Sequence, residues 1–293
     1  MTPRGVMMNE ASASEPFAAV TETHSAAVFF AGERAYKLKK PVALGFLDFT
    51  SPQVRAKACR REIELNRRFA PDIYLGLAEI RGPDGRVCDH LVTMRRLPSA
   101  RRLSTLVTAR APADGAVRDV ARVLAAWHAV APRSPEIAVQ GGRDALWGRW
   151  QANIGQSRGV AGGLLDAAGL DEMERLAGRF TAGRAELFGE RMHDGRIVDG
   201  HGDLLADDIF CLDDGIPILD CLEFDDRLRW LDGLDDACFL AMDLERLGAR
   251  DLAGRFISWY AEYSGDPGAR VAVPPLHGVP GLRPSQGGQP AGS

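Results

Sequence analysis

A short His-Gly-Asp run in the second half of the chain contains the acids with the clearest chemical potential. Asp203 ends this run, Asp208 follows five residues later, and Asp220 closes the apolar stretch after an Asp-Asp-Gly turn. A hairpin between them would bring Asp208 and Asp220 together. Mg²⁺ prefers oxygen ligands, often one or two carboxylates plus substrate phosphates, while a separate aspartate can take a proton from an attacking hydroxyl. The run therefore indicates metal-assisted phosphate chemistry, although turn formation by Asp and Gly explains it equally well when it is taken alone.

A lysine and a glutamate in the first seventy residues could hold phosphate groups. Side chains alternate along the strand expected here, which places Ala35 and Lys37 on one face. In the helix that follows, Glu62 lies on the apolar stripe, whereas Glu64 lies among arginines at helical spacing. Because a buried acid needs a partner, we expect Glu62 to pair with Lys37. The alternatives are a solvated lysine run at 37–40 and an acid that only borders the stripe.

The composition limits the classes of partner. A chain of 293 residues, 45% of them hydrophobic, can bury a large core. Its net charge of -4 and pI near 5.9 argue against nucleic acid as a partner. Five cysteines form no Cys-x-x-Cys pair, which favours free thiols in a cytoplasmic protein over disulfides or a zinc site. No long apolar run occurs, so we expect no membrane partner, and no P-loop motif supplies a nucleotide site.

Strand and helix signals divide the chain into two parts. The first hundred residues alternate strands with one helix, which starts at Thr50-Ser51-Pro52 and is stopped by Ala70-Pro71. The remainder is mainly helical around a β-rich island at 197–222. The strands are expected at 26–30, 35–39, 74–81 and 87–95, and the later helices at 117–130, 145–154, 173–187 and 234–247.

This order predicts an α+β fold of two lobes, with ligands between them. The tail is rich in Gly, Pro and Gln. GC-rich codons for this stretch, read one nucleotide later, can encode an amphipathic helix, so we hypothesise a frameshift upstream of it. We expect a disordered leader at 1–16, a nucleotide-binding N-lobe at 17–96, a catalytic and acceptor-binding C-lobe at 97–265, and a disordered tail at 266–293.

Several motifs in combination resemble the aminoglycoside phosphotransferase and choline kinase branch of the kinase superfamily. A His-x-Asp run followed by a metal ligand five residues later, and then by an Asp that ends a strand, is similar to the kinase catalytic loop. The form His-Gly-Asp-Leu is typical of this branch. More narrowly, residues 17 to 265 look like a bacterial subfamily of uncharacterised aminoglycoside-phosphotransferase-like proteins. The segments that carry this likeness are Tyr36–Val42, Gly45–Phe49, Leu65–Arg68 and Phe239–Leu244.

The resemblance implies a two-lobed protein-kinase-like fold, with a small antiparallel-sheet N-lobe and a mainly helical C-lobe. It implies that Asp203 is the catalytic base, Asp220 the principal Mg²⁺ ligand and Asp208 the second ligand. Lys37 would reach the phosphates, with Glu62 as its anchor. The family normally has Asn where this chain has Asp208, which puts ordinary catalysis in question.

Three further segments are expected to contact the nucleotide, which would be ATP, with GTP as the alternative. Ala35 would leave room for the adenine ring. The run Thr23-His24-Ser25 would cover the phosphates with hydroxyl and backbone N–H groups, although a simple strand-entry turn is an equal alternative. The run Met94-Arg95-Arg96 would form the hinge whose backbone groups meet adenine.

A histidine and several acids near Asp203 receive structural or open interpretations. His201 is expected to support Asp203 through a buried hydrogen bond rather than to act as a base. Either Asp232 or Asp236 is expected to brace the loop. The acids directly after Asp220 could attract a cationic acceptor or could simply be solvated. These acids are Glu223, Asp225 and Asp226.

These features lead to one main hypothesis and two alternatives. The main hypothesis is phosphorylation of a hydroxyl on a small-molecule acceptor, with ATP and Mg²⁺ as cofactors; the sequence does not specify the acceptor. A nucleotide-binding pseudoenzyme or regulatory module is the first alternative, favoured by Asp208. A metal-dependent phosphohydrolase built on Asp203, Asp208 and Asp220 is the second, but it leaves Lys37 and Glu62 unexplained.

Overall fold

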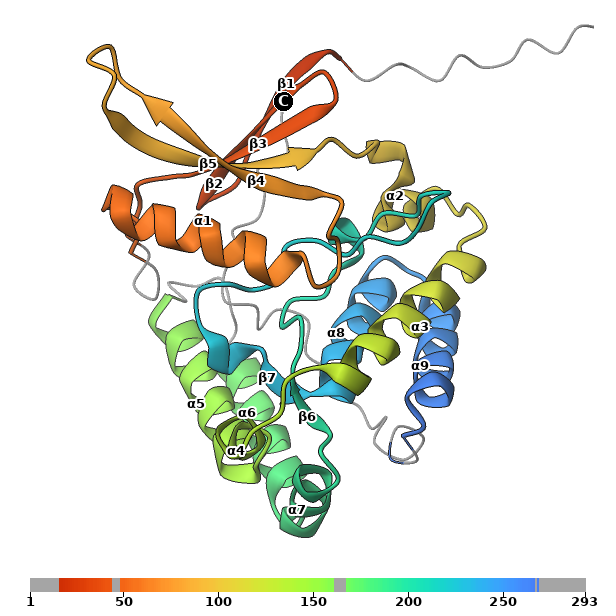
Figure 1. Ribbon diagram of the computed structural model, residues 1–293. Coiled ribbons are helices and arrows are strands. Elements are labelled where there is room, and N and C mark those ends of the chain that lie inside the picture. Colours follow the sequence, from red (N-terminus) through yellow and green to blue (C-terminus); the bar gives the residue numbers. More distant parts are fainter. Residues whose placement is uncertain (1–15, 44–47, 161–166, 267, 269–293) are drawn as a thin grey trace, which may run out of the picture.

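The first part of the chain forms a five-stranded antiparallel sheet with one helix packed against it (Figure 1). The computed structural model describes residues 16–43, 48–160, 167–266 and 268. The predicted leader up to residue 15, the predicted tail from residue 269 and the Gly45–Leu47 part of one motif lie outside the described residues. The strand order is β1-β2-β3-β5-β4. The elements of this N-lobe are β1 (Ala18–Glu22), β2 (Ala26–Ala31), β3 (Arg34–Lys39), α1 (Pro52–Asn66), β4 (Tyr74–Arg81) and β5 (Val87–Arg95).

Helix α1 packs its apolar stripe against the sheet. Cys59 and Ile63 of α1 join Val92 of β5 in one buried cluster. The helix starts at Pro52, as its capping signal predicts, and ends at Asn66, a few residues before the predicted stop. The four predicted strands are confirmed. Strand β1 escapes prediction because four of its five side chains are exposed, which leaves no alternating pattern.

The C-lobe, which we take from η1 onward, is mainly helical and, in its described residues, contains one two-stranded sheet. In Figure 1, α3, α8 and α9 lie together on one side and α4 to α7 on the other. Leu124, Leu240 and Phe256 are completely buried in a shared core, to which Leu204 and Ile218 also belong. The segment around the His-Gly-Asp run therefore rests directly on this core. The elements are η1 (Ser99–Arg101), α2 (Leu103–Thr108), α3 (Asp114–Val130), α4 (Pro135–Gln140), α5 (Arg143–Val160), α6 (Ala167–Thr181), α7 (Ala185–His193), β6 (Ile197–Asp199), η2 (Ala206–Asp208), η3 (Asp226–Leu228), β7 (Trp230–Asp232), α8 (Gly233–Arg246) and α9 (Arg250–Ser264).

Four features of the C-lobe differ from the sequence prediction. The helix expected at 173–187 is two helices, separated near Gly183, whose φ of +72° is left-handed and interrupts a helix. Helix α9 lies where no helix is predicted. Within the β-rich island, Ile197–Asp199 pairs with Trp230–Asp232, outside the island. The hairpin expected after Asp203 is present only in outline, through isolated bridges such as Ile209 to Ile218.

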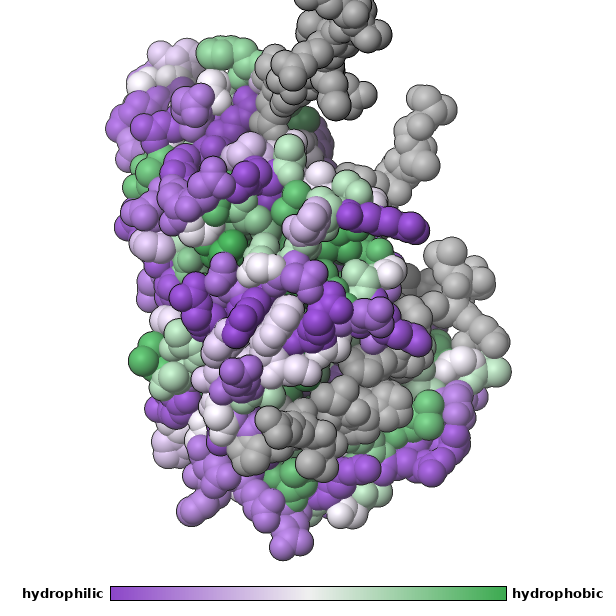
Figure 2. Space-filling view, turned by 90° about the vertical axis from the view of Figure 1, so that its right-hand side faces the viewer, coloured by the Kyte–Doolittle hydropathy of each residue, from purple (hydrophilic) through white to green (hydrophobic). Residues whose placement is uncertain are grey.

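Hydrophilic residues cover much of the described surface on the face that Figure 2 shows. On this face, hydrophobic residues form small groups at several heights, with several of them in the upper half of the view. No helix within the described ranges is both long and apolar enough to cross a bilayer. All five cysteines are free thiols, as the spacing predicts.

Candidate active site

Two lysines on one face of β3 share a buried glutamate from α1. Alternation along the strand places Ala35, Lys37 and Lys39 on that face. Glu62 is completely buried; its Oε1 lies 2.9 Å from Lys37 Nζ and its Oε2 lies 2.7 Å from Lys39 Nζ. Burial alone would raise the pKa of Glu62, but Lys37 and Lys39 outweigh it and lower the pKa to about 2. Glu64 is exposed, as the helix-face argument predicts.

The same two lysines reach carboxylates of the C-lobe. Lys37 Nζ lies 2.5 Å from Asp220 Oδ1, and Lys39 Nζ lies 2.6 Å from Glu223 Oε1. The five charged groups form a continuous chain with Glu62 at its centre. Sequence reasoning places Lys39 only in a solvated lysine run, yet its side chain is 3% exposed. Its burial depends on Glu223, which is 184 residues away in the chain, and no local pattern reveals that contact.

Asp220 has an unusual backbone conformation that N-lobe side chains hold in place. Its φ of +61° lies in the left-handed region, which favours glycine. The backbone N–H of Asp220 donates to the hydroxyl oxygen of buried Tyr74 at 3.2 Å. The next backbone N–H, that of Cys221, donates to Asn66 Oδ1 at 2.9 Å. Strain of this kind persists only where the surroundings impose it, and it is frequent at functional sites.

The His-Gly-Asp loop is shaped by close packing and by a buried acid. Gly202 has a φ of +85°, and a Cβ there would lie 3.0 Å from a neighbouring arginine side chain. Asp236 of α8 accepts the backbone N–H groups of His201 at 2.7 Å and Gly202 at 3.0 Å. His201 Nε2 lies 2.9 Å from the carbonyl oxygen of Leu219, and burial lowers the pKa of His201. The loop that carries Asp203 is therefore fixed from behind by Asp236 and from the side by His201.

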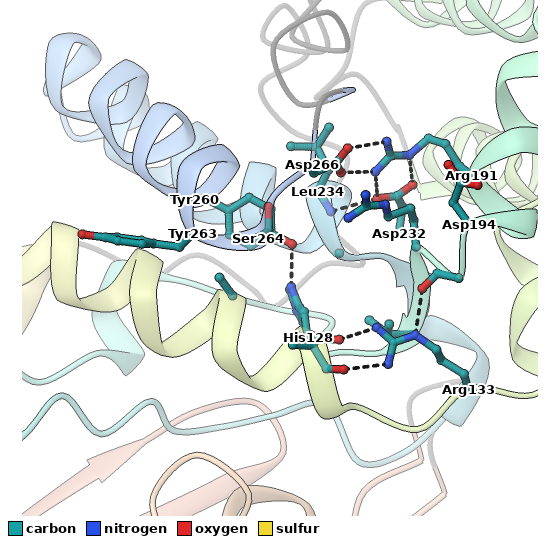
Figure 3. Close-up of a pocket in the computed structure, with 16 residues that line it drawn as sticks. His128, Arg133, Arg191, Asp194, Asp232, Leu234, Tyr260, Tyr263, Ser264 and Asp266 are labelled. Carbon is teal, nitrogen blue, oxygen red and sulfur yellow. Dashed lines mark hydrogen bonds and ion pairs between the residues drawn. The ribbon is translucent and has the colours of Figure 1, made fainter.

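Behind the loop, Asp236 belongs to a buried network that joins three helices. Asp236 Oδ2 lies 3.0 Å from His128 Nε2, and His128 Nδ1 lies 2.8 Å from Tyr260 Oη. His128 and Tyr260 line a cavity of about 160 Å³, shown in Figure 3. Asp232, the other candidate brace, instead caps α8 by accepting the N–H of Leu234 at 2.9 Å, and it pairs with Arg191.

Asp208 lies near the two other acids of the run. Burial first, and then the charges of Asp220 and Asp203, raise the pKa of Asp208 well above its ordinary value. The Asp208 carbonyl accepts the N–H of Leu219 at 2.8 Å, which draws the two arms together. Among the described residues, no three acidic, histidine or cysteine side chains form a ready metal cluster. Mg²⁺ needs only one or two carboxylates when phosphate and water complete its shell, so Asp208 and Asp220 fit such an ion.

The run Thr23-His24-Ser25 forms the turn between β1 and β2. Thr23 Oγ1 accepts the backbone N–H of Ala26 at 3.1 Å. The Ser25 carbonyl accepts the N–H of Lys40 at 2.7 Å, while the side chain of His24 is exposed. The Thr23 hydroxyl is therefore already used within the turn, and phosphate contacts from this run stay a prediction.

The predicted hinge is partly engaged in the sheet. The N–H groups of Arg95 and Arg96 donate to the carbonyls of Ile73 and Glu33, each at 2.9 Å. Met94 is buried in the N-lobe core. A base bound here would therefore meet other backbone groups of this segment.

Apolar side chains from both lobes pack against the N-lobe core that contains Ala35. They include Val28 of β2, Leu97 just after β5, and Leu219, which directly precedes Asp220. Sequence reasoning does not single them out because they lie far apart in the chain and belong to ordinary apolar segments.

The acids that follow Asp220 all have positive partners. One partner of Asp226 is Arg229, a completely buried arginine that also donates to Asp199 and to the Leu222 carbonyl. All three acids are paired with basic side chains rather than free to attract a cationic acceptor. The side chains of Asp225 and Asp226 are 33% and 46% exposed, so the alternative of solvated acids holds for these two, whereas that of Glu223 is only 13% exposed. The pairs are Glu223 with Lys39 at 2.6 Å, Asp225 with Arg227 at 2.9 Å and Asp226 with Arg229 at 2.6 Å.

Solved structures share this architecture. A choline/ethanolamine kinase family protein from Mesorhizobium loti matches with a TM-score of 0.50 and 14% identity, over 89% of this chain and 74% of that chain. The GDP and kanamycin complex of APH(2″)-IIia matches with a TM-score of 0.52 and 15% identity, over 86% of this chain and 80% of that chain. The chain therefore has the aminoglycoside phosphotransferase and choline kinase-like fold, as its motifs predict.

Sequence relatives lie among mycobacterial proteins. Uncharacterised proteins of Mycobacterium tuberculosis and Mycobacterium bovis are 47% identical to this chain over 252 residues, which is 86% of the chain. The chain spans about half, 51%, of the length of these relatives. No protein-family profile matches the chain.

Proposed function

We propose that this chain transfers the γ-phosphoryl group of ATP, or of GTP, to a hydroxyl group of a small molecule. The observation that carries the proposal is the Lys37–Glu62 ion pair, which faces the acids of the C-lobe through Lys37 and Asp220. A phosphohydrolase would use Asp203, Asp208 and Asp220 but would give the buried lysine–glutamate pair no task. A phosphotransferase uses all five residues.

In this proposal the residues act mainly by position and charge. Lys37 exchanges Asp220 for the nucleotide phosphates, while Glu62 holds its ammonium group in place. Asp203 accepts the proton of the acceptor hydroxyl as that oxygen bonds to the γ-phosphorus. The bond from the γ-phosphorus to the bridging oxygen of the nucleoside diphosphate breaks. Little covalent chemistry falls to the protein, so positioning and electrostatic stabilisation supply most of the rate.

Asp208 and Asp220 would hold Mg²⁺, which when bound neutralises phosphate charge. The purine would lie against Ala35, Val28 and Leu219, whose apolar side chains belong to the core at the junction of the lobes. Ala35 and Lys37 are neighbouring positions on one face of β3, so in the proposal the base lies beside the phosphates along this strand.

The acceptor would be selected by groups other than the acids after Asp220. One solved relative is a complex with kanamycin. In this chain, Glu223, Asp225 and Asp226 are each neutralised by a basic side chain. An acceptor that needs several free carboxylates at this position is therefore a poor fit, and uncharged hydroxyl compounds belong in any substrate screen.

Thermal-shift titration with ATP, GTP and Mg²⁺, followed by a transfer screen with γ-labelled nucleotide over hydroxyl compounds, tests the proposal. Asp203→Asn serves as the matched variant. It should keep nucleotide binding and lose transfer by about 10²- to 10⁴-fold, because the base touches the acceptor rather than the nucleotide. A wild-type chain that binds neither nucleotide would overturn the proposal, and equal loss of nucleotide binding in the variant would refute the role of Asp203.

A nucleotide-binding protein without transfer is the second candidate function. The observation that favours it is Asp208, a carboxyl group repelled by Asp220 and Asp203. Nucleotide binding by both the wild type and Asp208→Asn, with transfer by neither over the whole screen, would support this candidate over the first.

A further inference from the structure

Lys39 is the more enclosed of the two lysines of the site, with a side chain 3% exposed against 15% for Lys37, and it has no role in the proposed reaction. Its ammonium group contacts Glu62 of α1 and Glu223 of the C-lobe, and it lies 5.1 Å from the centroid of the buried Phe49 ring. Burial alone would lower the pKa of Lys39, but Glu62 and Glu223 outweigh burial and raise it. The lysine is therefore charged and held by groups from two lobes.

Lys37 and Lys39 differ in whether they must release their C-lobe partner when the nucleotide binds. The side chain of Asp220 is 45% exposed, and in the proposed function Lys37 leaves it when the nucleotide binds. The side chain of Glu223 is only 13% exposed, and nothing in the proposed function requires it to leave Lys39. When Lys37 exchanges Asp220 for the phosphates, Glu62 holds Lys37 through Oε1 and keeps its second ion pair, with Lys39, through Oε2. An uncompensated buried carboxylate would be strongly unfavourable.

The segment after Leu219 is held at several points. The Lys39–Glu223 pair lies at one end of the segment, and the bond from the Asp220 N–H to the Tyr74 hydroxyl lies at the other. Between them, the Cys221 N–H donates to an N-lobe asparagine. The N-lobe therefore fixes the register of four consecutive residues that begin with the proposed Mg²⁺ ligand.

We propose that Lys39 is a positioning residue that holds Glu62 and the segment after Asp220 in one arrangement, so that Lys37 can exchange Asp220 for nucleotide phosphates. This inference rests on the proposed function and adds to it a second lysine, which touches neither substrate nor metal. Lys39 acts through Glu62, whose Oε1 it leaves directed at Lys37.

The test compares Lys39→Met with Lys57→Met, which removes an exposed lysine from α1. Calorimetric titration of the full chain with ATP and Mg²⁺ should show an affinity about tenfold or more weaker for Lys39→Met. Lys57→Met should bind like the wild type. Equal affinity of Lys39→Met and wild type would overturn the proposal for Lys39 alone, whereas a wild type that fails to bind would overturn the proposed function and this inference with it.

A double variant separates positioning from mere stability. Lys39→Met leaves Glu223 buried without its cation, so the melting temperature should fall. Adding Glu223→Gln removes that buried charge and should restore much of the melting temperature, and it provides a folded protein if the single variant is unstable. Nucleotide affinity should stay weak, because Glu62 still lacks the partner of its Oε2. Recovery of affinity together with melting temperature would show a purely structural role and overturn the proposal.

Discussion

Acids with little exposure hold both the front of the site, at Lys37 and Lys39, and the rear of the His-Gly-Asp loop, but they hold different kinds of group. At the front, Glu62 and Glu223 bind the ammonium groups of lysine side chains. At the rear, Asp236 binds the backbone N–H groups of His201 and Gly202. A lysine can turn to a new partner, whereas a backbone N–H inside a packed loop cannot. The comparison suggests a front that reorganises around a ligand and a rear that keeps Asp203 in place.

A second buried aspartate of α8 also accepts a backbone N–H of the loop. Asp243 is buried, and its Oδ2 accepts the backbone N–H of Ala206 at 3.0 Å. Asp236 and Asp243 are seven residues apart, so they lie on one face of α8 two turns apart. A single helix face thus fixes two points of the loop, one before Asp203 and one after it.

The largest effect on stability is expected at the rear. In Asp236→Asn, one of the two oxygens that accept the His201 and Gly202 N–H groups becomes an amide NH₂, so two donors face each other. The free energy of unfolding should fall by about 2–4 kcal/mol. Chemical denaturation measures it, with the exposed Asp251→Asn as control. A variant as stable as the control would show that the rear is less rigid than we infer.

A substitution at the front should affect ligand binding more than stability. Glu62→Gln removes the charge between Lys37 and Lys39, which keep Asp220 and Glu223 as partners. Nucleotide affinity should fall by about tenfold, or roughly 1.4 kcal/mol, because Lys37 is less well placed. Calorimetry with ATP and Mg²⁺ measures this change.

Glu64→Gln is the matched control for this front substitution. It lies on the same helix, but its side chain is 68% exposed and forms its ion pair with Arg61 at 2.9 Å. Surface ion pairs contribute little, so its affinity should be near that of the wild type. If Glu64→Gln is the more damaging of the two, the assignment of the helix faces to function is wrong.

The sequence predicts the elements whose signals are local. The 74–81 and 87–95 strands match β4 and β5, and the Gly-Pro-Asp-Gly turn between them marks where one strand ends and the next begins. Helix α9 also carries a helical pattern, with Leu252, Phe256 and Tyr260 four residues apart and all buried, so a stricter count would have found it. Strand β1 carries no such pattern, and only its pairing with β2 defines it.

The contacts of the site likewise divide into those that local patterns predict and those that only tertiary packing creates. The pairing of Glu62 with Lys37 follows from one helix face and one strand face, and the structure has that contact at 2.9 Å. The choice between Asp232 and Asp236 as brace could not be made, since both start the same helix and only tertiary packing separates them. The burial of Lys39 depends on an acid in the other lobe, which no spacing rule predicts.

A substitution of Asp208 tests how strongly repulsion between the acids at the front of the site affects stability. Three acids lie close together there, and Asp208→Asn removes one charge while keeping an oxygen for a metal. Without metal, the variant should be more stable than the wild type by about 1–2 kcal/mol, because repulsion from Asp220 and Asp203 is relieved. Mg²⁺ should therefore raise the melting temperature of the wild type more than that of the variant.

The measurement for Asp208 is melting temperature against Mg²⁺ concentration, with and without ATP. ATP alone adds negative charge and should not replace the metal in the wild type. Indistinguishable Mg²⁺ responses would show that Asp208 does not lie at the metal. An Asn variant that binds nucleotide but loses transfer would show that the carboxylate has its own chemical role.

The smallest effect is expected at Asp235, next to Asp236 but without its backbone donors. Burial, and then the charge of Asp232, raise the pKa of Asp235 from 3.8 to about 6, although Arg149 partly opposes this. Because the folded-state pKa is the higher one, folding favours the protonated acid, and stability is lost as pH rises from about 4 through 6. Asp235→Asn should therefore be more stable than the wild type at pH 7 by about 1 kcal/mol, with this advantage vanishing near pH 4. Melting temperatures of the wild type and Asp235→Asn across pH 4 to 8 test this prediction. A difference between them that does not change with pH, or an Asn variant that is less stable at pH 7, would mean that partners stabilise the Asp235 charge as fully as that of Asp236.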